Sequence, residues 1–150
     1  MGFKKWLLIG ALLLLASGCG ARTDGEDPGE PGTGTKKYDH AVDESTDVID
    51  MHGRITNLEK LDAFFAGETD NQRLVRYTIE GDPIFYELTR KQDSVEVRYD
   101  TSQDKFGSPS VKTYGCESLG KKETERGVSY VLTGCDADRE IEVLTVAVEG

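Results

Sequence analysis

The sequence predicts an α+β domain in which two short N-terminal helices pack on a mostly antiparallel sheet of five or six strands. Apolar residues follow a helical spacing before residue 67 and alternate with polar residues after residue 73. About a hundred residues remain once the N-terminal segments are set aside, which is enough for one small core. We therefore expect a single domain over residues 43–150.

Residues 1–18 have the pattern of a bacterial lipoprotein signal peptide. Lys4 and Lys5 form a basic start, the apolar run 6–15 is too short to span a bilayer, and small residues precede Cys19. We expect cleavage before Cys19 and its acylation by chains such as palmitate. The lipid would then hold the protein on the outer, extracytoplasmic face of the cell membrane. The alternatives are an ordinary secretory signal and an uncleaved anchor helix.

Residues 19–42 are expected to form a flexible linker. The stretch 20–35 is dense in Gly, Pro, Asp, Glu and Thr and holds no bulky apolar residue, so it cannot bury enough surface to fold. Its acidic residues lack the spacing of an EF-hand loop, and neither His40 nor His52 stands in a recognised metal-binding motif. We therefore expect no metal site and no bound cofactor.

The first predicted helix covers residues 43–53. Val48, Ile49 and Met51 supply its apolar side, and Gly53 stands where a left-handed residue ends a helix.

The second predicted helix covers residues 56–67. Thr56 and Glu59 match the S/T-x-x-E capping box, and Gly67 ends the helix. Four apolar side chains share one face: Leu58, Leu61, Phe64 and Phe65. We expect this face to belong to the core.

From residue 73 the alternation of apolar and polar residues predicts strands. Residues 73–80 and 84–89 flank a Gly-Asp turn and read as a hairpin, and residues 94–100 add a third strand of a meander. Turn-forming residues make 101–110 a loop. Three further strands are expected around residues 111–119, 128–133 and 141–148.

Cys116 and Cys135 are expected to form a disulfide. A tight turn over residues 124–127, with Gly127 at a positive φ, sets the two cysteines directly opposite each other on paired strands. Opposed Cα atoms lie about 4.5 to 5.5 Å apart, which a disulfide accepts. An exported protein also meets oxidising surroundings. The alternative is a pair of buried thiols in a register shifted by one residue.

The chain is strongly acidic, with a formal net charge of −10 at pH 7. Nucleic-acid binding is therefore not expected, and contact with the membrane should come from the lipid rather than from a basic patch. Six charged residues form a possible recognition surface on or beside the sheet: Arg73, Arg76, Glu80, Asp82, Arg98 and Asp100. In it, Arg73 and Arg76 would bind a carboxylate or phosphate group. The alternative is a solvated strand face with weak cross-strand ion pairs.

These observations favour a non-enzymatic binding or accessory module whose partner is an unknown envelope protein or ligand. The sequence has no G-x-S-x-G elbow, no C-x-x-C pair and no zinc motif. The alternative is a small envelope hydrolase or transferase that uses carboxylates such as Glu80, Asp82 and Asp100 as acid and base.

Several separated stretches also carry a resemblance to a known family: DMHGRITNLEKLDAFF, RLVRYTIEGDPIFYEL, DTSQDKFGS, TYGCESLGKKETE and YVLTGC. The chain resembles an uncharacterised domain-of-unknown-function family (4362) of small lipoproteins from Bacillus-type Gram-positive bacteria. The resemblance covers about residues 45–145. It implies attachment to the outer face of the cell membrane. It implies no activity and carries over no catalytic or binding residue.

Overall fold

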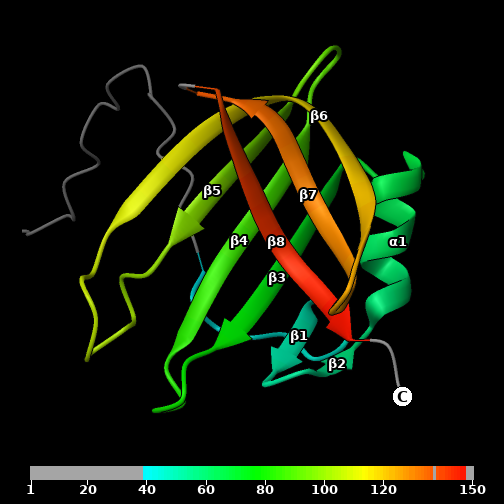
Figure 1. Ribbon diagram of the computed structural model, residues 1–150. Helices are drawn as coiled ribbons and strands as arrows, with labels where there is room; N and C mark the ends of the chain where they lie inside the picture. Colours follow the sequence, from blue (N-terminus) through cyan, green and yellow to red (C-terminus); the bar gives the residue numbers. More distant parts are fainter. Residues whose placement is uncertain (1–38, 137, 148–150) are drawn as a thin grey trace, which may run out of the picture. The chain divides into compact units, whose positions relative to one another are not determined.

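The computed structural model describes residues 39–136 and 138–147, which form one β-sheet and one α-helix (Figure 1). The eight strands lie in the order β2-β1-β3-β4-β5-β6-β7-β8. The strands are β1 (Val48–Met51), β2 (Arg54–Thr56), β3 (Asn71–Tyr77), β4 (Pro83–Arg90), β5 (Val95–Asp100), β6 (Val111–Thr124), β7 (Gly127–Cys135) and β8 (Arg139–Ala147), and the helix is α1 (Leu58–Ala66). The predicted signal peptide and Cys19 lie outside the described residues.

All neighbouring strands are antiparallel except β1 and β3, which run parallel. The sheet curls, so that β6, β7 and β8 turn round to face β3, β4 and β5 (Figure 1). Its concave side holds the main core, to which α1 contributes Leu61 and Phe64. In the part of the chain described here, no helix is long and apolar enough to cross a membrane.

The predicted fold class is wrong, because the described residues are mostly β. They form one helix and an eight-stranded sheet, not two helices on a sheet of five or six strands. Residues 43–53, expected to be helical, instead form a turn at residues 44–46, then β1 and the turn into β2. His52 and Gly53 both have positive φ, 55° and 88°, as a two-residue hairpin turn requires. Val48 and Ile49 are β-branched and buried, which suits a strand that is packed on both faces.

The second predicted helix is confirmed as α1, but its expected capping box does not form. Gly67 ends the helix with φ 83°, while the N-cap is Asn57 at φ 58°, with no side-chain capping bond. The Asn57 amide instead donates to the carbonyl oxygens of Glu44 and Asp47, at 2.8 and 2.7 Å. This residue therefore ties the start of α1 to the segment before β1.

The predicted meander is confirmed as β3, β4 and β5, and the loop 101–110 follows it. The register of β6 and β7 is also as predicted, because Cys116 lies opposite Cys135 and the two form a disulfide with Cα atoms 3.9 Å apart. Gly127 has φ 136°, and a Cβ there would lie 1.9 Å from the carbonyl oxygen of Val146. Only glycine fits this turn.

Residues 39–47, here called the strap, contact the convex side of the sheet. The ring of His40 lies 5.6 Å from the ring of Phe85, and Phe85 is buried. Arg73 donates to the carbonyl oxygens of Asp39 and Ala41, at 2.8 and 2.7 Å. Asp39 and Ala41 belong to the range expected to be linker, so the last part of that range packs on the domain.

Candidate functional site

Three tyrosines lie on the concave side of the sheet because of the strand register. Tyr86 on β4 pairs with Tyr99 on β5, and Val97 on β5 pairs with Tyr114 on β6. Side chains alternate between the two faces of a strand, so these residues share the face that carries the core residue Leu88, which pairs with Val97. The three rings thus form one aromatic wall.

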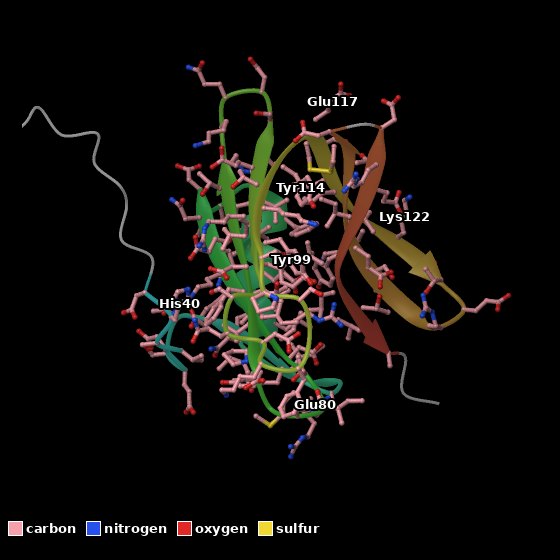
Figure 2. All side chains as sticks on the ribbon, turned by 90° about the vertical axis from the view of Figure 1, so that its left-hand side faces the viewer. His40, Glu80, Tyr99, Tyr114, Glu117 and Lys122 are labelled. Atoms are coloured by element: carbon pink, nitrogen blue, oxygen red, sulfur yellow. A yellow bond between two sulfur atoms is a disulfide. The ribbon has the colours of Figure 1, made fainter. Side chains whose placement is uncertain are left out.

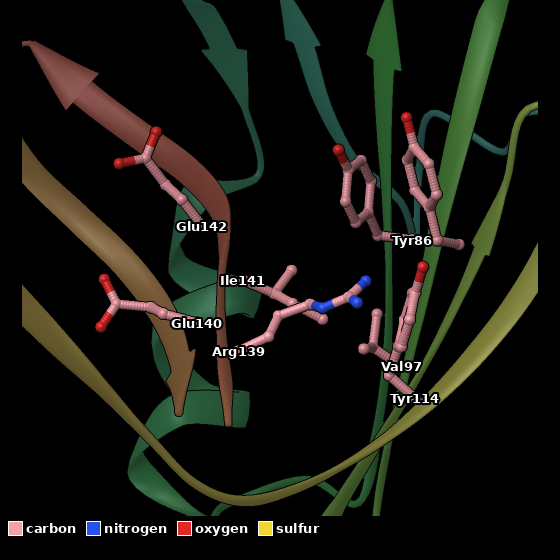
Figure 3. A pocket seen from close by; sticks show the side chains of 8 residues that line it. Tyr86, Val97, Tyr114, Arg139, Glu140, Ile141 and Glu142 are labelled. Carbon is pink, nitrogen blue, oxygen red and sulfur yellow. The ribbon is translucent and has the colours of Figure 1, made fainter. Parts of the chain in front are cut away.

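The curl of the sheet brings the start of β8 opposite this wall and leaves a cleft of about 290 Å³ between them. The lining residues come from β4, β5, β6 and β8: Tyr86, Val97, Tyr99, Tyr114, Arg139, Glu140, Ile141 and Glu142. Figure 3 shows Arg139 and Ile141 pointing toward the tyrosines. We call this the tyrosine cleft.

Tyr86 and Tyr99 pack against each other with ring centroids 4.9 Å apart and planes tilted by 49°. Burial raises the pKa of Tyr86 to about 12, Tyr99 adds to the rise, and the positive charge of Arg76 opposes it. The phenol of Tyr86 is therefore neutral at physiological pH and can donate a hydrogen bond.

Arg139 is the charged side chain that faces the tyrosines. Its guanidinium carbon lies 5.2 Å from the centroid of the Tyr114 ring. The neighbouring glutamates point away from the rings (Figure 3): Glu140 accepts a hydrogen bond from Lys122, and Glu142 accepts one from Ser129 at 3.0 Å. No carboxylate within residues 39–136 and 138–147 pairs with Arg139.

The six residues of the predicted recognition surface are not brought together. Arg73 binds the strap on the convex side, where Arg98 also bonds Asp100 at 2.6 Å. Arg76 lies on the concave side, where it donates to Asp50 at 3.1 Å and to the carbonyl oxygen of Val143 at 3.4 Å. Arg73 and Arg98 thus lie on the convex face and Arg76 lies on the concave face, and each of them binds groups of its own domain.

Glu80 and Asp82 lie in the turn between β3 and β4. Glu80 is exposed at one end of the sheet, apart from Tyr99 and Tyr114 (Figure 2). Asp82 is buried, and hydrogen bonds from the side chain and the backbone of Lys105, at 2.6 and 2.9 Å, lower its pKa. Asp82 therefore fastens the loop 101–110 to this turn.

One group of side chains has the composition of a hydrolytic triad, but not its geometry. His40 Nε2 lies 3.1 Å from Asp100 Oδ2 and 3.4 Å from Ser102 Oγ. In a triad the acid and the hydroxyl contact opposite ring nitrogens, so that the ring can take the hydroxyl proton while the acid orients it. Here both contact the same nitrogen, and the group serves to hold the strap.

Comparison with known proteins places the chain in a family. The family model described as a domain of unknown function, DUF4362, matches residues 45–131, which is more than half of the chain. The chain belongs to the DUF4362 family. The matched range includes Tyr86, Tyr99 and Tyr114, whereas Arg139 lies beyond it. No curated protein and no solved structure matches the chain.

Sequence reasoning did not find the tyrosine cleft. One signal was present, because Tyr86, Tyr99 and Tyr114 fall in the predicted strands 84–89, 94–100 and 111–119. The pairing of these strands, which puts the three rings on one face, comes from the structure. Arg139 gave no signal, since the last strand was expected only from residue 141. The pairing of β7 with both β6 and β8 puts Arg139 on the same face of the sheet as Tyr114.

Proposed function

We propose that this DUF4362 protein is a non-enzymatic binding module, held by a lipid on the outer face of the cell membrane, with the tyrosine cleft as its binding site. The composition of the cleft carries this proposal. It combines three phenol rings and two aliphatic side chains with one guanidinium that has no carboxylate partner among the described residues. The two glutamates of the lining, Glu140 and Glu142, point away from the rings (Figure 3) and bind Lys122 and Ser129. Concave apolar surfaces with a few polar groups are typical of ligand sites.

The position of the acidic residues supports binding rather than hydrolysis. Glu80, Asp82 and Asp100 line no part of the tyrosine cleft. Asp82 is held by Lys105, and Asp100 by Arg98 and His40. Their charges stabilise the fold, so they are poorly suited to exchange protons with a substrate.

The membrane location rests on the sequence. Lys4, Lys5, the short apolar run and Cys19 form the pattern that lipoprotein processing requires. The binding site would then face the envelope on the outer side, where a protein or a small molecule could reach the cleft.

In-cell crosslinking of four tagged forms tests this proposal: wild type, Cys19→Ala, Tyr114→Ala and Arg126→Gln. Arg126 is exposed in the turn between β6 and β7, away from the cleft lining, so its variant is the control. We expect wild type and Arg126→Gln to capture the same partner at the membrane. Tyr114→Ala should lose this partner at equal protein abundance, and Cys19→Ala should be released from the membrane.

A Tyr114→Ala form that captures the same partner would contradict the cleft as the binding site, and a membrane-bound Cys19→Ala form would contradict the lipid anchor.

A further inference from the structure

We infer that the tyrosine cleft binds a monocarboxylate carried on an aromatic or apolar body, with Arg139 pairing with the carboxylate and the tyrosine rings contacting the body. This inference rests on the proposed binding role of the cleft and names the chemical class of its ligand.

The guanidinium of Arg139 is not paired with an acid among the described residues. In a chain with 28 acidic and 18 basic residues, this arginine faces an aromatic wall instead of an acid. Glu140 is adjacent to Arg139 in the sequence, but it binds Lys122 and not Arg139. The planar guanidinium offers a fork of N–H donors that matches the two oxygens of a carboxylate. These donors are available to a ligand.

Apolar side chains line both sides of the cleft. Tyr114 and Val97 form one wall, and Ile141 faces them from β8 (Figure 3). Ligand clefts usually have volumes of about 300 to 1,000 Å³. A cleft of about 290 Å³ is at the small end of that range and suits one ring or a short aliphatic group.

The charges of the cleft favour a single negative charge on the ligand. Arg139 faces the rings and repels a cation, whereas Glu140 and Glu142 point away from the rings (Figure 3) and bind Lys122 and Ser129. Among the described residues of the lining, one guanidinium in a protein of net charge −10 is poor compensation for a dianion such as a phosphate monoester. The nearby Arg76 does not add a second free cation, because it binds Asp50. A single negative charge is therefore the best match.

The guanidinium of Arg139 is positioned for binding in advance. Contact with the Tyr114 ring holds the guanidinium at the cleft before any ligand arrives. Because the side chain already lies at the cleft, it loses less conformational freedom on binding than a mobile arginine would. The contact with the ring is weak at an exposed site, so a turn of Arg139 toward a carboxylate costs little interaction energy.

Calorimetric titration of the full chain in a non-ionic detergent tests the inference. The probes are N-acetyl-L-phenylalanine, its uncharged amide, acetate and phenethylammonium. We expect the acid to bind about tenfold or more tightly than the amide, because hydrogen bonds to a charged group contribute more than neutral ones. Acetate, which lacks the body, and phenethylammonium, which has the opposite charge, should bind more weakly than the acid.

Matched variants assign the effect to the cleft. Arg139→Gln should remove the preference for the acid over the amide, while Arg126→Gln, with the same change of net charge, should keep it. Tyr114→Phe should bind the acid as wild type does, and Tyr114→Ala should weaken both the acid and the amide. Thermal unfolding of each variant shows whether it is folded, and the Tyr114→Phe form provides a second test if Tyr114→Ala does not fold.

Equal affinities for acid and amide in the wild type, tighter binding of phenethylammonium, or no binding by any probe would overturn the inference. So would an unchanged preference in Arg139→Gln. A peptide that ends in a free phenylalanine separates two sources of the same chemistry: tighter binding than N-acetyl-L-phenylalanine indicates a chain terminus, and equal binding indicates a free acid.

The titration is also independent of the crosslinking experiment. Probe binding that depends on Arg139, together with capture that does not depend on Tyr114, would keep the carboxylate site and reject the cleft as the site for the captured partner. Capture that depends on Tyr114, without a preference for the acid, would keep the binding module and reject the ligand class.

Discussion

Arg73 binds Asp47 through two hydrogen bonds, from Nε to Oδ1 at 2.8 Å and from Nη2 to Oδ2 at 2.6 Å. The side chains are 20% and 4% exposed, so the pair is largely shielded from water. The hydrogen bonds and the charge of Asp47 raise the pKa of Arg73, although its burial opposes the rise. This pair fastens the strap to β3.

Removing one partner of this pair should destabilise the domain. In Arg73→Ala the carboxylate of Asp47 stays buried without its cation, which costs about 3 kcal/mol in the free energy of unfolding. Urea denaturation measures the change, with the exposed Arg126→Ala as the control. A loss below about 1 kcal/mol would place Arg73 among ordinary surface ion pairs. Because Arg73→Ala is expected to destabilise the domain, a loss of partner binding in this variant would not by itself show that Arg73 contacts the partner.

Asp100 should make stability depend on acid pH. Burial acts to raise the pKa of this carboxyl, but hydrogen bonds from Ser102, His40 and Arg98 outweigh it and lower the pKa to about 2. Since the pKa is lowered on folding, the stabilisation is complete above the unfolded value of about 4 and is lost as the pH falls toward 2.

The amount lost should be about 2 kcal/mol, because the pKa differs by nearly two units. Urea denaturation between pH 5 and pH 2 measures it in wild type and Asp100→Asn. Other carboxyls titrate in the same range, so the difference between the two curves is the relevant quantity. Parallel curves would show that Asp100 does not carry this dependence.

The disulfide should stabilise the domain by about 3 kcal/mol, because Cys116 and Cys135 are 19 residues apart and the bond closes a loop of that size in the unfolded chain. Guanidinium denaturation with and without reductant gives the value. The double variant Cys116→Ser, Cys135→Ser should be as unstable as the reduced wild type and insensitive to reductant. Two free thiols in the purified oxidised protein, detected by alkylation and mass spectrometry, would contradict the bond.

Tyr86 should titrate late in an alkaline absorbance titration. Burial and the neighbouring Tyr99 raise its pKa to about 12, so the neutral phenol is favoured by folding. The associated stabilisation is complete below the unfolded value of about 10 and is lost as the pH rises through 12. Tyr86→Phe should remove the late step, and Tyr114→Phe should leave it. A late step that survives in Tyr86→Phe would belong to another tyrosine.

Local sequence signals predicted the parts of the fold that local chemistry determines. The apolar face of α1, the glycine that ends it and the turn at Gly127 all depend on residues close together in the chain. The register that opposes Cys116 and Cys135 follows from that one turn. In each case a few neighbouring residues were sufficient.

The same reasoning failed at residues 43–53 for a physical reason. The four residues of β1 are too few to show a period of two, and the glycine of a left-handed turn looks the same after a helix as in a hairpin. What makes Val48 a strand residue is its parallel pairing with Leu74, a contact between distant parts of the chain. No local pattern reports such a contact.

The candidate site depended still more on long-range geometry. Most of the charged residues that the sequence singled out proved to bind other groups of the domain, as Arg98 binds Asp100 and Asp82 binds Lys105. The cleft needed Tyr114 and Arg139 to meet, which depends on the pairing of β6 and β8 with β7 and on the curl of the sheet (Figure 1). Curvature is a property of the whole sheet, and the sequence pattern of single strands does not reveal it.

The strap also decides where the domain takes mechanical load. Tension applied on the N-terminal side of residue 39 reaches Arg73 through the carbonyl oxygens of Asp39 and Ala41, before it reaches β1. β3, which carries Arg73, is flanked by strands on both sides, so the force enters the interior of the sheet and not its edge. A pull would have to break the hydrogen bonds of Arg73 to the strap and the contact of His40 with Asp100 before it reached β1, and all of these lie on the face opposite the tyrosine cleft.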